Sequence, residues 1–427
     1  MSSQARSLRC FEEVVIRITD NQSATVHFVK PSGSGLIVPR HVGDFLLSQK
    51  NSDQFRDLLR LYPQTAAVLQ QVGWLDEQIV YRRVLRSPHL KRLQIEVALT
   101  CNLSCSYCFS GSGPGRKERL THEEVIDIIA QADAMAVQQI DFTGGEYLMI
   151  PRWREQIAYA RELGMIVTVH SNGTLFTPAV VQALRELSVA YVQVSVDSHL
   201  DEVHDAARGH RHALRRTLTG LDRLHEAGVD CRISLMVHRG NTTTMGDSIK
   251  FFSDHYPDFL INIDRVIGTT QAANDVGVSN ETFWDVVSPY LGDRVLPSKA
   301  CGTDISAETF EPECGVYYSY LYLTAEGEIA ACPTMTSREE PQFTGPNIRD
   351  TSLWDAWYEN DMMTSLRHTN CENVTSCPVG SSCGGGCRSN AYNDTGRLSG
   401  PDYIACNKNK NPGTAFIDFA SLYARVK

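Results

Sequence analysis

Three closely spaced cysteines are the residues of this chain best suited to do chemistry. They are Cys101, Cys105 and Cys108 in the segment CNLSCSYC. A closed structural zinc site holds four protein ligands, so this group is one ligand short. Three thiolates on a tight loop can instead hold three irons of a cubane iron-sulfur cluster and leave the fourth iron open to a small molecule. The spacing therefore predicts a ligand-binding cluster, with part of a zinc site as the alternative.

A second and larger group of cysteines lies in the C-terminal third of the chain. Its eight thiols are enough for two closed sites of four ligands, which suits two iron-sulfur clusters or two structural zinc ions. The run YLYLTAEGEIAAC predicts a β-hairpin with Glu326 and Gly327 in its turn, which would bring two of these cysteines together. Cys10 and Cys231 fall outside both groups and are expected to be small buried hydrophobic residues. The eight cysteines of this C-terminal group are Cys301, Cys314, Cys332, Cys371, Cys377, Cys383, Cys387 and Cys406.

Length and composition limit the class of protein. A chain of 427 residues allows two or three domains. The segment before Cys10 has no apolar signal core, and no run approaches the ~18 apolar residues of a membrane span. We therefore expect a cytoplasmic protein without a membrane partner, whose cysteines are metal ligands rather than disulfides. A net charge of -10 argues against nucleic acid as a partner, and the nearest approach to a basic stripe, RGHRHALRR from Arg208 to Arg216, is short and mixed with histidine.

The middle of the chain must position the first cysteine group. From Arg92 onward, strand patterns alternate with helix patterns, and Thr121 with Glu124 forms a capping box at the start of one helix. Thr177 and Pro178 form a similar start signal for another. Six such βα units predict an α/β fold with a parallel sheet, open or closed as a barrel. The strand candidates are RLQIEVALT, QQIDFTGG, IVTVHSNG, YVQVSVDS, DCRISLMV and LINIDRVI.

The predicted strands are polar on one face. A parallel strand covered on both sides should be apolar throughout, but Val192, Val194 and Val196 alternate with Gln193 and Ser195, and the other strands do the same. A covered polar face needs partners or a ligand, so we expect the sheet to enclose a polar cavity. Glu96 and His170 are expected to line it without contacting a substrate. An antiparallel sheet with one wet face is disfavoured, because helices of ten or more residues separate the strands.

The segment before the predicted sheet has a different pattern. Between Glu13 and Gln78, three short strand patterns (EVVIRI, TVHFVK and GLIVP) precede three helix patterns. The stretch from Tyr81 to His89 is predicted to be a linker. Beyond Cys301, cysteine and glycine replace the helical rhythm, which indicates a tail held together by metal.

The cysteine loop directly after the first strand, followed by GGE after the second, resembles the radical SAM enzymes. The resemblance implies a partial (β/α)6 radical SAM barrel over residues 91–295. It also implies that the three cysteines hold a 4Fe-4S cluster whose open iron binds S-adenosylmethionine, which is cleaved reductively to methionine and a 5'-deoxyadenosyl radical. A reductant such as flavodoxin or ferredoxin would supply the electron. The residues that match the family's cofactor-binding positions are Tyr107, Gly144, Gly145, Glu146, Ser171, Asn172, Ser195, Asp197 and Arg208. Ordinary turn and cap roles remain the alternative for Gly144, Gly145, Ser171, Asn172 and Asp197.

The tail, residues 296–427, resembles the cysteine-rich SPASM domain of the same enzymes. That resemblance implies two auxiliary 4Fe-4S clusters, and so three clusters in all. Cys371 departs from the family pattern, which would place a cysteine at Val374. The implied ligand sets are Cys301, Cys314, Cys332 and Cys387 for one cluster, and Cys371, Cys377, Cys383 and Cys406 for the other.

The first ninety residues resemble the winged-helix-like α+β module that binds the leader of a ribosomally made precursor peptide. A cap that only shields the barrel is the alternative. Taken together, the resemblances imply a radical SAM/SPASM peptide maturase that oxidatively modifies a precursor peptide, with crosslinking as the expected outcome. A formylglycine-generating sulfatase maturase and a peptide epimerase are the alternative enzymes. An iron-sulfur electron carrier or a peptide-binding scaffold would leave the open iron and the GGE motif unexplained.

Overall fold

The computed structural model describes the central part of the chain almost completely and the two ends in part. Within these residues, no helix combines the length and the apolar character needed to cross a membrane. The described residues are 13–18, 23–28, 35–39, 80–86, 90–135, 137–266, 275–292, 294–297, 316, 318–338, 340–378 and 385–410.

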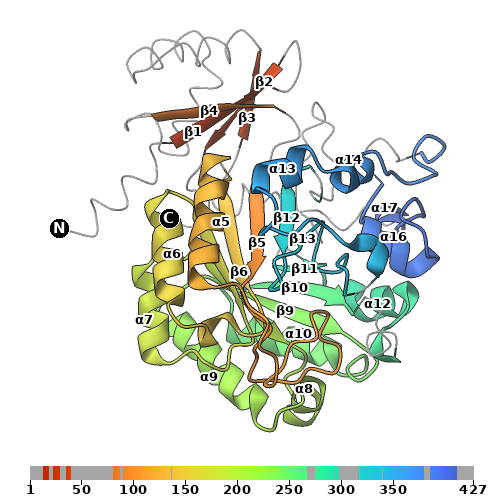
Figure 1. Ribbon diagram of the computed structural model, residues 1–427. Helices are drawn as coiled ribbons and strands as arrows, with labels where there is room; N and C mark the ends of the chain where they lie inside the picture. Colours follow the sequence, from red (N-terminus) through yellow and green to blue (C-terminus); the bar gives the residue numbers. More distant parts are fainter. Residues whose placement is uncertain are drawn as a thin grey trace.

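A nine-stranded sheet forms the centre of the molecule (Figure 1). Its order is β11-β10-β9-β8-β7-β6-β5-β12-β13, and every neighbouring pair is parallel except β12 and β13. The six predicted strands are therefore present as sequential neighbours in one parallel sheet. The strands are β5 (Arg92–Glu96), β6 (Gln139–Thr143), β7 (Ile166–Ser171), β8 (Tyr191–Val196), β9 (Cys231–Val237), β10 (Leu260–Arg265), β11 (Val295–Pro297), β12 (Tyr320–Leu323) and β13 (Ile329–Ala330).

Helices between the strands cover the outer face of this sheet, and both predicted start signals are confirmed. The Thr121 side chain accepts from the Glu124 amide at 3.1 Å, while the Glu124 carboxylate accepts from the Thr121 amide at 2.6 Å. The Thr177 side chain accepts from the Val180 amide at 3.3 Å and caps the helix Pro178–Glu186. The helices are α5 (His122–Ala134), α6 (Trp153–Glu162), α7 (Pro178–Glu186), α8 (Asp201–Arg208), α9 (Ala213–Glu226) and α10 (Met245–His255).

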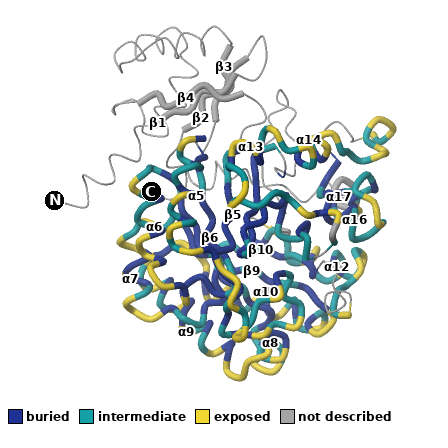
Figure 2. Tube along the Cα trace, in the orientation of Figure 1, coloured by how far each residue is buried: buried dark blue, intermediate teal, exposed yellow. Residues whose placement is uncertain are grey.

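The two faces of the sheet differ in polarity, as the alternation predicts. Side chains such as Val192 and Val194 are fully buried in one continuous apolar core, and Figure 2 shows the strands buried while exposed positions lie on the outer helices. On the other face, buried Asp141 accepts from Thr168 Oγ1 and Gln139 Nε2, both at 2.6 Å, and pairs with Arg92. Burying a carboxylate is costly unless it is paired, so these partners stabilise the polar face.

The C-terminal segment adds two strands, β12 and β13, to the central sheet. β12 lies parallel to β5, with Tyr322 opposite Gln94. It then turns through Gly327 into β13, so the predicted hairpin is present. The helices of this segment are α13 (Leu353–Tyr358), α14 (Asp361–Arg367), α16 (Arg388–Thr395) and α17 (Tyr403–Lys410). Helix α12 (Asn280–Val287) lies before it, and the 3-10 turns of the described chain are Tyr147–Met149, Ser288–Tyr290 and Pro341–Phe343.

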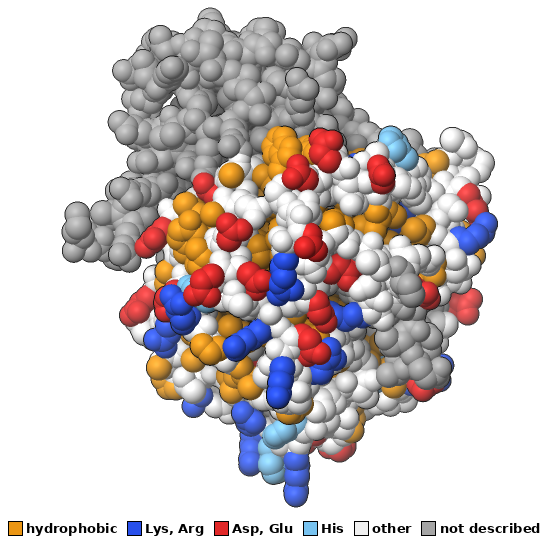
Figure 3. Space-filling model, in the orientation of Figure 1, with side chains coloured by type: hydrophobic (Ala, Val, Ile, Leu, Met, Phe, Trp, Pro, Cys, Tyr) orange, Lys and Arg blue, Asp and Glu red, His pale blue; other side chains and the backbone are white. Residues whose placement is uncertain are grey.

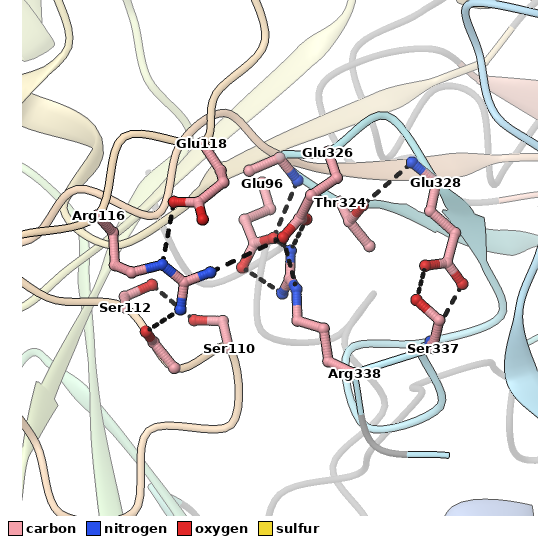
Figure 4. Close-up of polar contacts among 12 residues, drawn as sticks. Glu96, Ser110, Ser112, Arg116, Glu118, Thr324, Glu326, Glu328, Ser337 and Arg338 are labelled. Atoms are coloured by element: carbon pink, nitrogen blue, oxygen red, sulfur yellow. Dashed lines mark hydrogen bonds and ion pairs between the residues drawn. The ribbon is translucent and has the colours of Figure 1, made fainter. Parts of the chain in front are cut away.

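A buried carboxylate fastens this hairpin to the barrel. Glu96, at the end of β5, is fully buried and accepts from Arg338 Nη2 at 2.5 Å, from Arg338 Nη1 at 3.2 Å and from the Ala325 amide at 3.0 Å. Arg338 also pairs with Glu326 in the hairpin turn, and Glu326 lies 4.0 Å from Arg116 (Figure 4). Glu96 is thus satisfied by protein groups, as predicted, and links three segments of the chain.

The N-terminal strands form a separate four-stranded sheet in the order β3-β2-β1-β4. The three predicted strands are present as β1 (Glu13–Ile18), β2 (Ser23–Phe28) and β3 (Gly35–Pro39), paired antiparallel. The predicted linker was wrong for most of its length, because β4 (Val80–Arg86) pairs parallel with β1. A parallel partner must return through a long crossover, so the pairing is invisible in a local pattern. The three predicted helices lie outside the described residues.

Candidate active site

The cysteine loop begins where β5 ends, and hydrogen-bond donors surround its sulfur atoms. Asn172 Nδ2 lies 3.8 Å from Cys101 Sγ, and Arg208 Nη1 lies 3.9 Å from Cys105 Sγ. Cys108 Sγ accepts from the Ser112 amide at 3.4 Å. Such donors stabilise negative charge on sulfur, so the loop suits bound thiolates.

Burial keeps the first of these thiols protonated when no cation is near. Cys101 is 6% exposed, and burial, with contributions from Glu146 and the other two thiols, raises its pKa to about 12. A thiol of this kind ionises when a metal binds it. In the described part of the chain, no three His, Cys, Asp or Glu side chains converge on a single ion position. A cubane cluster does not require convergence, because each thiolate binds a different iron.

The GGE turn after β6 lies directly against the strand that leads into this loop. The Gly145 amide donates to the Ala98 carbonyl at 2.6 Å, and the Glu146 amide donates to Thr100 at 3.0 Å. A Cβ atom on Gly145 would lie 2.2 Å from the Thr100 carbonyl oxygen. Glycine is required here because the two backbones touch, and the contact delivers Glu146 to the mouth of the barrel.

The Glu146 carboxylate is buried and collects donors from the end of β7. It accepts from Ser171 Oγ at 2.9 Å and from the Asn172 amide at 2.8 Å. Burial raises the pKa of Glu146 to about 7, although these hydrogen bonds oppose the shift. Since the Asn172 side chain also reaches Cys101 Sγ, the fold joins the GGE turn, the end of β7 and the cysteine loop in one polar site.

A second buried network reaches the loop from β8. Arg208 donates to Asp197 through Nε at 2.6 Å and Nη2 at 3.0 Å, and the Tyr107 hydroxyl donates to the same carboxylate. Burial alone would raise the pKa of Asp197, but the Arg208 charge outweighs it and holds the pKa below its ordinary value. Arg208 thereby connects Asp197 to Cys105 Sγ, and Tyr107 is fixed beside the cluster loop.

Two histidines that the sequence reasoning missed complete this network. His204 Nδ1 accepts from the Asp197 amide at 3.2 Å, and the His238 ring lies 5.5 Å from the Tyr107 ring. Burial lowers the pKa of both imidazoles, to about 4 for His204. The position of His238 directly after β9 could have signalled it, because ligands bind at the carboxyl ends of parallel strands.

One predicted residue, Ser195, contacts none of the other described site residues through its side chain, and its cofactor role stays a prediction. Ser195 lies half-buried on the polar face of β8, opposite Ser234, and makes no side-chain hydrogen bond to another described residue. Its neighbour Asp197, one step further along the same face, is the residue that reaches the loop.

The structure describes five of the eight C-terminal cysteines. Cys332 and Cys387 lie close enough for the charge of Cys387 to raise the pKa of Cys332, although burial is the larger cause. Both were predicted to ligate one cluster. Cys371, Cys377 and Cys406 are half-buried. Cys301, Cys314 and Cys383 lie outside the described residues, so the two ligand sets stay predictions.

Replacing Gly209 with alanine is expected to destabilise the packing of the cysteine loop. A Cβ on Gly209, whose φ is +63°, would lie 2.3 Å from the Ser104 carbonyl oxygen. Gly228→Ala is the matched control, because Gly228 also has a φ of +63° but its Cβ would meet nothing within 4 Å. The left-handed backbone costs each variant about 1 kcal/mol, and the overlap adds about 1 to 3 kcal/mol at Gly209 alone. Urea unfolding measures the difference, and equal losses would contradict the expectation.

Comparison with known proteins decides which family this site belongs to. Residues 95–252 match the radical SAM superfamily. This segment is a radical SAM domain. The match begins within β5 and ends in α10, so it includes the cysteine loop, the GGE turn and the Asp197–Arg208 pair. A 4Fe-4S cluster and S-adenosylmethionine are the cofactors of this radical SAM domain, and the donor-lined thiols and the buried Glu146 fit them.

Curated relatives share most of the chain. The chain is 28% identical over 292 residues to the sporulation killing factor maturation protein SkfB of Bacillus subtilis (strain 168), covering 66% of this chain and 70% of SkfB. It is 26% identical over 362 residues to the mycofactocin maturase MftC of Mycolicibacterium smegmatis, covering 78% and 86%.

Solved structures share the fold. Streptococcus suis SuiB bound to the precursor peptide SuiA superposes with a TM-score of 0.70 at 15% identity, covering 92% of this radical SAM protein and 98% of SuiB. The protein anSMEcpe with bound AdoMet and a Cp18Cys peptide gives a TM-score of 0.59 at 15% identity, covering 79% and 99%.

Proposed function

We propose that this radical SAM protein is a peptide maturase that oxidatively modifies a ribosomally made precursor peptide. The observation that carries the proposal is its resemblance to SkfB and MftC, both named as maturation enzymes, together with the site built on Cys101, Cys105 and Cys108. The likeness to peptide-bound SuiB supports it, because that match extends over 92% of this chain whereas the anSMEcpe match covers 79%. A cytoplasmic location belongs to the proposal, because thiols there stay reduced.

The N-terminal sheet is proposed to bind the leader of the peptide. Its outer strands, β3 and β4, each have one edge without a partner strand among the described residues. An extended leader could add to such an edge through main-chain hydrogen bonds. In the same proposal, the eight C-terminal cysteines hold two auxiliary clusters, so the chain binds three clusters, and a flavodoxin or ferredoxin supplies the electrons.

The residues of the site have distinct proposed roles. In this proposal Cys101, Cys105 and Cys108 would bind the cluster, and Glu146 would accept a hydrogen bond from the amino group of S-adenosylmethionine. Asp197 holds Arg208 and Tyr107 in place beside the cysteine loop. Bound cluster and S-adenosylmethionine together supply a 5'-deoxyadenosyl radical, which removes a hydrogen atom from the peptide.

The proposal is tested by coexpression with a short peptide encoded beside this gene, followed by mass spectrometry. Loss of two hydrogen atoms from the peptide is expected, because an oxidative crosslink removes them. Conversion of a cysteine or serine to formylglycine would support the sulfatase-maturase alternative. An unchanged mass with an inverted residue would support an epimerase, and an unmodified peptide would contradict a maturase acting on it.

Binding of S-adenosylmethionine is expected to weaken as the pH falls below about 7. The ligand's amino group would donate to the ionised form of Glu146, and burial raises the pKa of that carboxyl to about 7. Apparent affinity follows the ionised fraction, so it falls about tenfold for each pH unit well below this value. Isothermal titration of the cluster-loaded protein between pH 5.5 and 8 measures the slope. Glu146→Gln should bind weakly and with a shallower slope in this range, because only the proton of the ligand's own amino group then contributes to the slope. An equal slope in both proteins would exclude Glu146 as the titrating group.

A further inference from the structure

A basic turn joins α8 to α9 on this otherwise acidic protein. Arg211 and Arg215 are exposed there, although the whole chain has a net charge of -10. Figure 3 shows Arg, Lys and His side chains gathered at the lower tip of the molecule, where Figure 1 places α8 and the start of α9. The acidic residues Asp201 and Glu202 lie in the first turn of α8, at the opposite end of that helix. The turn is therefore a local region of positive charge, which we call the basic tip (residues 209–216).

The end of α8 and Gly209, the first residue of the basic tip, are packed directly against the cysteine loop. The Ser104 amide donates to the Arg208 carbonyl at 3.1 Å, and the Ser106 amide donates to the Ala207 carbonyl at 3.0 Å. Gly209 approaches Ser104 so closely that no side chain fits between them. Two loop residues next to these serines also contact Arg208: Cys105 Sγ lies 3.9 Å from its Nη1, and the Tyr107 ring centre lies 5.6 Å from its guanidinium carbon. The basic tip therefore directly follows, in the chain, a residue that contacts a proposed cluster ligand.

The tip also has a fixed shape. The Asp205 carboxylate accepts from the Leu214 amide at 2.9 Å and from the His212 amide, and so caps the start of α9. The buried Arg208–Asp197 pair anchors the end of α8. Hydrogen bonds and an ion pair thus fix the backbone of the turn that bears the exposed arginines. This keeps their charge close to one position relative to the cysteine loop.

We propose that the basic tip is the docking surface for the protein that reduces the radical SAM cluster, and that this partner is a small acidic one-electron carrier with a flavin or iron-sulfur centre. The inference rests on the proposed function, which requires an external reductant. In each event the carrier is oxidised by one electron and the cluster is reduced by one. Electron-transfer complexes have small, transient interfaces, so charge complementarity determines how often partners meet. A positive surface beside the cluster raises the association rate of an acidic carrier, most strongly at low salt.

The test compares two ways of reducing the same protein. The double variant Arg211→Glu/Arg215→Glu is first assayed for direct binding of flavodoxin by isothermal titration, where weaker binding than in the wild type is expected and equal binding would overturn the proposal. It is then assayed for 5'-deoxyadenosine release, with S-adenosylmethionine and either reduced flavodoxin or dithionite. Dithionite is a small reductant that needs no docking surface. The matched control is Arg185→Glu/Lys250→Glu, which has the same change in net charge on exposed positions of α7 and α10.

With flavodoxin at low salt, the tip variant is expected to be slower by about tenfold or more, and its rate should lose the salt dependence of the wild type. With dithionite, all three proteins should be equal. Equal slowing of the control variant would overturn the proposal, because net charge alone would then explain the effect. If the tip variant also releases 5'-deoxyadenosine more slowly with dithionite, the proposal is overturned, because the arginines would then act in cluster binding. If the tip variant binds the precursor peptide more weakly but keeps its normal rate with flavodoxin, the tip is a peptide-binding surface instead. If the wild-type protein forms no 5'-deoxyadenosine with dithionite, the proposed function itself is refuted.

Discussion

Replacing Cys101, Cys105 and Cys108 together with alanine is expected to abolish release of 5'-deoxyadenosine from S-adenosylmethionine. The three thiolates are the proposed protein ligands of the cluster, and Asn172 and Arg208 place hydrogen-bond donors beside two of their sulfur atoms. The loss should be complete, because no other group in the described site replaces a cluster ligand. Chromatography of anaerobic reactions with dithionite measures the product.

Iron analysis of the same triple variant tests the number of clusters. If the C-terminal cysteines hold two further clusters, the variant should retain about two thirds of its iron, since each cubane contains four irons. Cys231→Ala is the control, because Cys231 is buried like Cys101 but lies in the apolar core on β9. It should retain both iron and activity. Product formation by the triple variant would refute the enzyme hypothesis, and loss of all iron would refute the auxiliary clusters.

Replacing Asp197 with asparagine is expected to cost about 3 to 5 kcal/mol in the free energy of unfolding. Asparagine keeps the size of the side chain but removes its charge, which leaves the buried Arg208 guanidinium without a counterion. The Tyr107 hydroxyl also loses a charged acceptor. Denaturant unfolding under anaerobic conditions measures the loss.

Tyr107→Phe is the control for this variant. It removes the hydroxyl bond but leaves the Asp197–Arg208 pair intact, so its cost should be about 1 kcal/mol. The pKa of Asp197 is lower in the folded protein than its ordinary value of 3.8. The stabilisation is therefore fully present above that pH and is lost only as the pH falls through the lower folded value. Equal losses in Asp197→Asn and Tyr107→Phe would show that the buried charge pair contributes nothing.

Several features of the fold follow from local sequence patterns. The strands of the barrel and the start of α5 were predictable because a side-chain alternation and a capping box act over a few neighbouring residues. The two-faced character of the sheet was predictable for the same reason. The strand β4 was not, because its partner β1 lies more than sixty positions away and nothing local marks the pairing.

The sequence by itself determined which residues could do the chemistry: a three-thiol loop, a GGE turn after the next strand, and polar residues at strand ends. Only the tertiary structure decided how they combine. It paired Arg208 with Asp197 and placed Arg208 beside Cys105, and it brought Ser171 and Asn172 to Glu146. It also paired β12 with β5, and an ion pair between Arg338 and Glu96 stabilises this contact. The physical reason is that each of these contacts depends on burial and on partners distant in the chain, whereas periodicity and spacing report only what neighbouring residues do.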